Sequence, residues 1–168
     1  MSTRKKICLS LLFLISISSY AQEPTTDFSK IDNVVNTLYN VISGPAGERD
    51  WSLFRSLFHE KALMGSTGFT REGNRAFGYF TPEGYIERNA PFFKERGFYE
   101  EELERITNKY GGIAQVFTSY QFRFEEKGEV VQRGVNSIQL IYEKDRWYIT
   151  QLFWEGESEK VPLQSLKK

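Results

Sequence analysis

Cysteine and histidine are almost absent from this 168-residue sequence, which contains one of each. The cysteine is Cys8, near the N-terminus, and the histidine is His59. A single cysteine cannot form a disulfide within the chain, and zinc sites use several cysteine or histidine ligands. We therefore expect no metal ion and no cofactor, and a fold that depends on its apolar core.

An excess of charge of either sign is also lacking. The sequence has 22 basic and 22 acidic residues, and the body of the chain contains no run of Lys or Arg. Nucleic-acid binding depends on clustered positive charge that contacts phosphates, so we expect no nucleic-acid partner. Apolar residues make up 40% of the chain, which at this length is enough for one folded domain.

The first 21 residues have the pattern of a secretory signal peptide. Residues 4–6 are basic, residues 7–17 form a short apolar stretch, and Ser19 and Ala21 supply small side chains before a cleavage site. The apolar stretch is shorter than the ~20 residues that cross a bilayer, so we expect no membrane span after its removal. Cys8 precedes this stretch, which argues against a lipoprotein. We expect export to the periplasm or beyond, with cleavage after Ala21.

Three helices are predicted in the first half of the exported chain. Apolar side chains recur at helical spacing over residues 31–42, and Asp50 has the features of the N-cap of a second helix. Thr81, followed by proline and an acidic residue, begins a third. Pro91 lies inside this third helix, where we expect a kink or an early break near Ala90.

The second half has the alternation of long strands. Polar and apolar residues alternate over residues 114–124, 130–142 and 146–154, with turns between them. Two short strands are expected earlier, at residues 62–65 and 76–80. Helices followed by a run of antiparallel strands predict an α+β domain.

One segment gives a conflicting signal. Tyr99, Leu103, Ile106 and Tyr110 are spaced four, three and four residues apart in a Glu-rich stretch. Taken alone, this spacing favours a helix.

Short sequence patterns follow one another in a distinctive order over residues 27–157. They are Asp50-Trp51 with Phe54, Leu57-Phe58 and Ala62; Gly97-Phe98-Tyr99-Glu100; Gly111-Gly-Ile-Ala114 with Val116-Phe117 and Tyr120; and Arg133-Gly134, Ser137, Gln139-Leu140, Arg146-Trp147-Tyr-Ile149 and Trp154. In order and spacing they resemble the nuclear transport factor 2-like (NTF2-like) superfamily.

The resemblance implies a cone-shaped fold, in which three N-terminal helices pack in the concavity of a strongly bent, mostly antiparallel sheet. It also implies that the segment after Gly97 is a long strand, and we follow it over the local spacing. The domain then covers residues 27–157, with a flexible lead-in at residues 22–26 and a polar tail at residues 158–168. Members of this fold often pair through the outer sheet face, so we expect a homodimer in which Phe117 is an exposed aromatic residue.

Alternation along the strands predicts which side chains line the inside of the cone. We expect the more apolar face of each long strand to point inward, and Gln151 and Phe153 share that face in the last strand. Polar groups on an apolar concave wall are typical of small-molecule sites. The candidate ligand-binding residues are Tyr39, Thr118, Tyr120, Asn136, Trp147 and Gln151.

The superfamily includes isomerases, dehydratases, cyclases, epoxide hydrolases and binding modules, so the fold does not decide the function. The position of the ketosteroid isomerase base falls near Ser66, which cannot serve as that base. His59 is expected in an exposed turn. The acidic run at residues 100–104 is expected to be solvated surface. No catalytic residue is assigned.

Three functions remain open. The first, which we favour, is an exported domain that binds a small apolar molecule in the cone. The second is a lyase or hydrolase with a Tyr/Glu acid–base pair, which a buried carboxylate would favour. The third is a protein-interaction module using the outer sheet face, which a filled, dry cone would favour.

Overall fold

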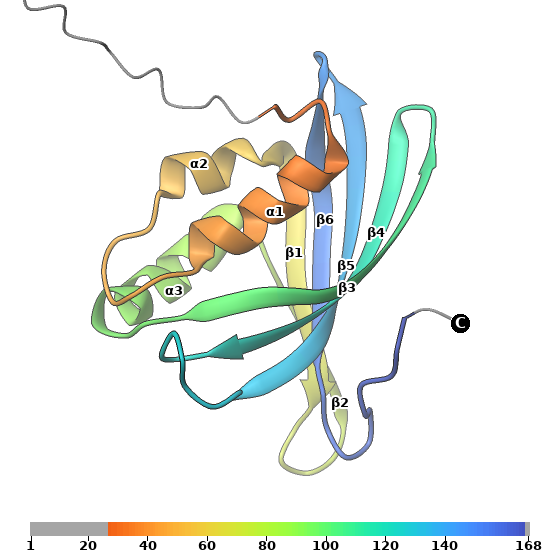
Figure 1. Cartoon of the computed structure of the whole chain (residues 1–168). Coiled ribbons are helices and arrows are strands. Elements are labelled where there is room, and N and C mark those ends of the chain that lie inside the picture. The colour runs from red at the N-terminus through yellow and green to blue at the C-terminus, as the bar shows by residue number, and fades with distance from the viewer. Residues whose placement is uncertain (1–26, 167–168) are drawn as a thin grey trace, which may run out of the picture.

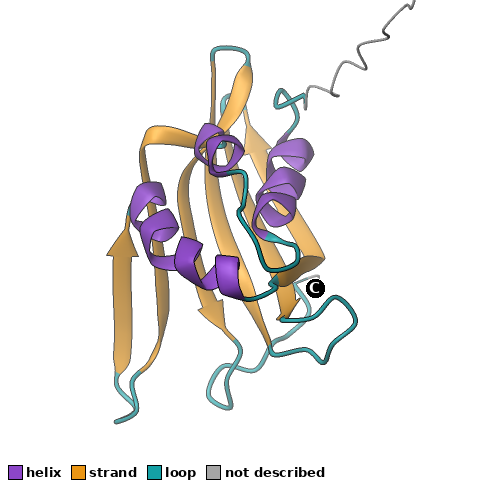
Figure 2. Ribbon diagram, turned by 90° about the vertical axis from the view of Figure 1, so that its left-hand side faces the viewer, coloured by secondary structure: helices purple, strands orange, loops and turns teal. Residues whose placement is uncertain are grey.

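The computed structural model describes residues 27–166, in which three helices lie on one side of a bent six-stranded sheet (Figures 1 and 2). The strand order is β2-β1-β6-β5-β4-β3. All neighbouring strands are antiparallel except β1 and β6, which are parallel. The elements are α1 (Ile31–Ile42), α2 (Trp51–Ser56), β1 (Phe58–Phe69), β2 (Arg75–Phe80), α3 (Pro82–Glu95), β3 (Tyr99–Tyr110), β4 (Ile113–Arg123), β5 (Gln132–Glu143) and β6 (Arg146–Gly156).

The helix starts follow the local capping rules read from the sequence. The Asp50 carboxylate accepts a hydrogen bond from the backbone N–H of Leu53 at 2.8 Å, and the Thr81 hydroxyl accepts one from Gly84 at 3.1 Å. The early break expected near residue 90 is wrong, because α3 continues through Pro91. Residue 87, whose carbonyl loses its helical partner to this proline, is exposed and can bond to water.

The segment after Gly97 is a strand. The family resemblance implied this strand, whereas the local spacing favoured a helix. β3 pairs with β4 from Tyr99 to Tyr110, with Leu103 as an extra, bulged residue. Leu103 is 43% exposed and Tyr110 is 85% exposed, so the apolar positions that favoured a helix do not form a buried stripe. Pairing along the whole length of β4 outweighs the local pattern.

A second bulge corrects the predicted inner face of β6. Gln139 pairs with Gln151 while Leu140 pairs with Ile149, so Thr150 is an extra residue. A one-residue insertion reverses the alternation of every following side chain. The inward orientation expected for Gln151 and Phe153 is therefore wrong: Gln151 is exposed on the outer face, and Leu152 and Trp154 point inward instead.

The core lies between α1 and the concave face of the sheet. Val34, Val35 and Leu38 of α1 are buried against Ile138 of β5 and Ile149 of β6. β1 is much longer than the four residues expected and runs from Phe58 to Phe69. Its N-terminal half belongs to the core, and its C-terminal half forms a hairpin with β2 that projects beyond the helices (Figure 1).

Gly134 of β5 allows the side chain of Tyr120 to lie flat across the sheet. The two residues are cross-strand neighbours. A Cβ atom at position 134 would lie 2.5 Å from the Tyr120 hydroxyl and 2.5 Å from the carbonyl oxygen of Glu155. A side chain at this position would therefore displace both the tyrosine and the neighbouring strand.

We predict that Gly134→Ala lowers the free energy of unfolding by about 1–3 kcal/mol, because the added methyl group overpacks this contact. Gly68→Ala in β1 is the matched control, since a Cβ there meets no atom within 4 Å. Urea unfolding of both variants measures the difference. Equal stability of the two variants would contradict the proposed close contact.

Candidate functional site

A cavity of about 220 Å³ lies between the helices and the concave face of the sheet. All three helices contribute to its wall, together with β1 and β3–β6. Phe92 and Gln132 line it and are exposed, so they lie where it meets solvent. Sixteen residues line the cavity, and half of them are aromatic: Phe54, Tyr85, Phe92, Phe93, Phe98, Tyr120, Phe122 and Trp154.

Glu100 of β3 places a carboxyl group in this cavity. Burial raises its pKa from the ordinary value of 4.5 to about 8, because a charged carboxylate loses hydration there, and a side-chain hydrogen bond with Asn136 lowers the pKa in part. Among the described residues that line the cavity, none is Lys, Arg or His. Glu100 is therefore the acidic group with which a bound molecule would interact.

The expectation that the whole acidic run is solvated surface is thus wrong for Glu100. In the strand, Glu100 and Glu102 point toward the helices, while Glu101 between them is exposed and bonds to Arg123 of β4 at 2.8 Å. This alternation was visible in the sequence. It was missed because a run of acidic residues usually lies on a solvated face.

Two tyrosine hydroxyls also reach the cavity. Tyr120 of β4 and Tyr85 of α3 line it, and neither hydroxyl has a hydrogen-bond partner among residues 27–166. Burial, followed by the nearby charge of Glu100, raises the pKa of both phenols. Both hydroxyls therefore stay protonated, and each can donate or accept a hydrogen bond with a ligand.

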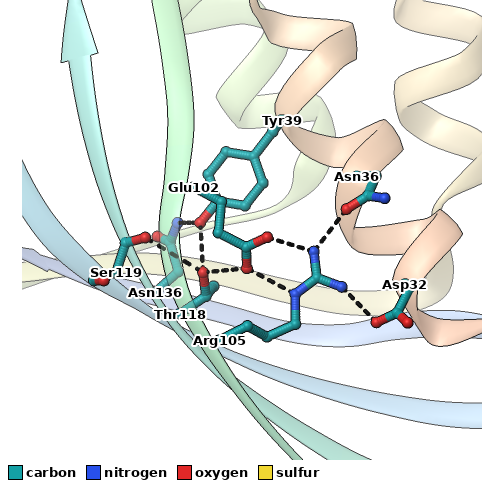
Figure 3. Close-up of polar contacts among 8 residues, drawn as sticks. All are labelled: Asp32, Asn36, Tyr39, Glu102, Arg105, Thr118, Ser119 and Asn136. Carbon is teal, nitrogen blue, oxygen red and sulfur yellow. Dashed lines mark hydrogen bonds and ion pairs between the residues drawn. The ribbon is translucent and has the colours of Figure 1, made fainter. Parts of the chain in front are cut away.

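A chain of polar contacts runs behind the cavity wall from β5 to the outside of α1 (Figure 3). The Asn136 amide donates to the Tyr39 hydroxyl at 3.0 Å, and that hydroxyl is 3.2 Å from the hydroxyl of Thr118. Thr118 donates to the Glu102 carboxylate at 2.5 Å. These contacts join α1, β3, β4 and β5 through side chains that are buried or partly buried.

Arg105 anchors the far end of this chain. It donates to both oxygens of Glu102, at 2.7 Å from Nε and 2.6 Å from Nη2. It also bonds to Asp32 at 2.6 Å and to Asn36 at 2.7 Å, both on α1 (Figure 3). Four contacts satisfy most of the guanidinium donors, so Glu102 is held as a paired carboxylate.

The six ligand-binding candidates separate into three groups. Tyr120 and Asn136 line the cavity. Tyr39 and Thr118 are buried in the polar chain behind it, and ligand binding by any of these four stays a prediction. Trp147 is buried away from the cavity, with its ring 5.2 Å from that of Tyr142. Gln151 lies on the opposite face of the sheet.

The positions discussed for other chemistries lie outside the cavity. Ser66 and His59 do not line it. The His59 side chain, 24% exposed, is more buried than expected and lies 3.7 Å from the carboxylate of Glu143. Among residues 27–166 no group of three acidic, histidine or cysteine side chains could hold a metal ion. In the same part of the chain, no helix is long and apolar enough to cross a membrane.

The outer face of the sheet has a second hollow of about 660 Å³, between the strands and residues 160–166. Phe117 lies there and is 40% exposed. The tail is attached at its described end, where the backbone N–H of Leu166 bonds to Glu104 of β3 at 2.8 Å. The tail therefore covers part of the face through which we expected two copies to pair, and the homodimer stays a prediction.

Comparisons with known proteins identify the fold. Neither protein-family models nor curated proteins gave a match. Among solved structures, an NTF2-like superfamily protein from Salmonella enterica has 14% identity and a TM-score of 0.53, covering 80% of this chain and 91% of that chain. An NTF2-like family protein from Streptomyces avermitilis has 12% identity and a TM-score of 0.54, covering 85% of this chain and 100% of that chain. An NTF2-like protein of unknown function from Pseudomonas putida has 10% identity and a TM-score of 0.59, covering 84% of this chain and 96% of that chain.

We predict that Glu100 makes the protein less stable as pH rises from about 4.5 to about 8. In this window the folded state keeps a proton that the unfolded state has lost, so unfolding becomes easier with rising pH and the effect levels off above the folded pKa. Relative to Glu100→Gln, the loss should reach about 2–4 kcal/mol, less than for full burial because the cavity meets solvent.

Urea unfolding at pH 5 and pH 8 measures this loss. Glu101→Gln is the matched control, because the pKa of exposed Glu101 is lowered by hydrogen bonds from Gln121 and Arg123, which affects stability only at lower pH. The same pH dependence in wild type and Glu100→Gln would show that Glu100 is not the group responsible.

Proposed function

We propose that this chain, which has the NTF2-like fold, is an exported protein that binds one small, largely apolar molecule in the cavity of its cone. The fold agrees with the prediction from sequence, and the structural neighbours show it. The observation that supports binding is the cavity itself: half of its wall is aromatic, and three polar side chains reach it without a full set of partners among residues 27–166, Glu100, Tyr85 and Tyr120.

The size of the cavity restricts the ligand. About 220 Å³ is below the ~300–1,000 Å³ of pockets that hold drug-sized molecules. A compound with a single ring is therefore a better fit than a sterol. Burial of about 200 Å² of apolar ligand surface is worth about 5 kcal/mol before the entropy lost on binding is subtracted, so we expect weak affinity for simple ring compounds.

We predict that single-ring compounds raise the melting temperature of the protein and that Tyr120→Phe weakens their binding several-fold when they carry a hydrogen-bonding group. The hydroxyl of Tyr120 has no hydrogen-bond partner among residues 27–166, so its removal should leave folding intact and remove about 1 kcal/mol from a ligand contact.

Thermal-shift screening followed by calorimetry makes the measurement, with Tyr110→Phe as the control because Tyr110 is 85% exposed on the same sheet. If no ring compound stabilises the protein at millimolar concentration, the cavity does not bind small molecules and the proposed function is wrong.

A second candidate function has support from Glu100. A general base works best when its pKa is near the working pH, and burial brings the pKa of this carboxyl to about 8. Tyr85 and Tyr120 supply the phenol of the Tyr/Glu pair that the lyase or hydrolase hypothesis requires. The same cavity could therefore remove a proton from a bound ketone while a tyrosine donates to its oxygen.

We predict for this candidate that the protein accelerates the exchange of the α-protons of cyclohexanone in heavy water at least tenfold over buffer. Proton NMR follows the exchange. Glu100→Gln should abolish the acceleration, and Glu101→Gln should preserve it. Exchange at the buffer rate with wild type would leave ligand binding as the proposed function and eliminate this kind of catalysis.

Export with cleavage after Ala21 belongs to the proposal as well. The predicted signal peptide and the predicted lead-in at residues 22–26 lie outside the described residues, and these two predictions rest on the sequence pattern alone.

A further inference from the structure

We propose that the molecule bound in this cavity is a small organic cation, a primary amine attached to one apolar ring, whose ammonium group pairs with the carboxylate of Glu100. This inference rests on the proposed function and names the chemical class of the ligand. Four features of the cavity support it: its charge, the direction of its hydrogen bonds, its aromatic wall and its proton balance.

The cavity supplies an anion without a protein counterion. Glu102, two residues away, is paired with Arg105, whereas Glu100 has no basic side chain beside it in the cavity wall. Arg49, in the loop between α1 and α2, lies over the ring of Phe93, 5.1 Å from its centroid. Its guanidinium group bonds to backbone carbonyls of residues 42–47 and does not line the cavity. A cationic ligand would supply the missing partner.

The hydrogen-bond chain behind the wall runs in one direction. The Glu102 carboxylate, held by Arg105, can only accept, so the single hydroxyl proton of Thr118 points to it. Thr118 must then accept from Tyr39, whose own proton is used in that bond. The oxygen of Tyr39 is left to accept from Asn136, which fixes the amide with its NH₂ group toward the tyrosine.

Burial has the larger effect on Glu100 and favours its neutral form, but Asn136 acts in the opposite direction. The side chain of Asn136 lowers the pKa of this carboxyl group, which is the effect of a hydrogen-bond donor. A donor stabilises the ionised carboxylate, whereas a site built to keep Glu100 protonated would present an acceptor to it. Asn136 therefore offsets part of the cost of ionising Glu100 when a cation binds.

The rest of the wall suits an ammonium group on a ring. Eight aromatic residues surround the space, and aromatic faces attract organic cations. A primary ammonium group has three N–H donors and no acceptor. The carboxylate of Glu100 and the hydroxyls of Tyr85 and Tyr120, which have no partner among residues 27–166, are three groups whose oxygen atoms can accept them.

Binding of an amine should release a proton. With a pKa of about 8, Glu100 is about one-tenth ionised at pH 7, which weakens the apparent affinity only about tenfold. The other titratable groups that face it are Tyr39 on α1, Tyr85 on α3 and Tyr120 on β4. Burial raises the pKa of all three, so they stay neutral and Glu100 alone titrates in this range.

Isothermal titration calorimetry with benzylamine, benzyl alcohol and benzoate tests the proposal, because the three share a ring and differ in charge. At pH 7, in phosphate and in Tris buffer, we expect benzylamine to bind at least about tenfold more tightly than benzyl alcohol and to release about one proton, seen as a buffer-dependent heat. Benzoate should bind most weakly. Glu100→Gln should bind benzylamine at least about tenfold more weakly than wild type and should release no proton on binding it. Its affinity for benzyl alcohol should stay the same.

Glu101→Gln is the matched control, since this carboxylate is on the same strand but faces outward, and benzylamine should bind it as it binds wild type. Equal affinities for benzylamine and benzyl alcohol, tighter binding of benzoate, or unchanged benzylamine binding to a folded Glu100→Gln would overturn the cation proposal and leave the cavity as a site for neutral or anionic ligands. Absence of binding by all three compounds would overturn both this proposal and the proposed function.

Discussion

Arg105 of the edge strand β3 forms an ion pair with Glu102 of the same strand and also bonds to α1, and the arrangement of polar groups inside the cone depends on these contacts. Two partly buried charges lose hydration, which costs several kcal/mol per ion, so such a pair is stable only when its remaining donors are also satisfied. Asp32 and Asn36 of α1 satisfy them here. Apolar packing brings α1 to the sheet but tolerates small rotations about the helix axis. The hydrogen bonds from Arg105 to Asp32 and Asn36 do not tolerate such rotations, and they therefore determine where Tyr39 points.

Two bulged residues decide which side chains reach the interior. Glu102 and Arg105 are three residues apart, so in a regular strand they would lie on opposite faces. Leu103 is an extra residue between them and brings both to the side of the helices. Thr150 has the corresponding effect in β6, where it turns Trp154 toward the cavity and Gln151 toward the outer face. The chemistry of the cone is thus set by irregular positions of the sheet as much as by its regular alternation.

These two features separate what the sequence could predict from what it could not. The caps at Asp50 and Thr81 depend on neighbouring residues, and the long C-terminal strands show a clear alternation, so local rules were sufficient for them. The strand after Gly97 needed the family resemblance, because its pairing with β4 overrides its own spacing. The bulges depend on the register between strands that are distant in sequence, so the inner face of β6 could not be read correctly past Thr150. The alternation of side chains along a strand could have placed Glu100 on the inner face, but only after its segment was treated as a strand.

Glu100 and Glu102 show how one strand can use the same side chain in two ways. The protein supplies the counterion of Glu102, and that carboxylate orients the bonds that lead to Asn136. The described residues of the cavity wall supply no counterion for Glu100. This residue therefore makes the free protein less stable at neutral pH, where a glutamine of the same shape would not. A ligand at one hundred times its dissociation constant stabilises the folded state by about 2.7 kcal/mol, which is comparable to that loss. The stability that Glu100 removes from the free protein is therefore of the size that a ligand of the proposed kind would restore, which is the relationship expected of a binding residue rather than of a residue that supports the fold.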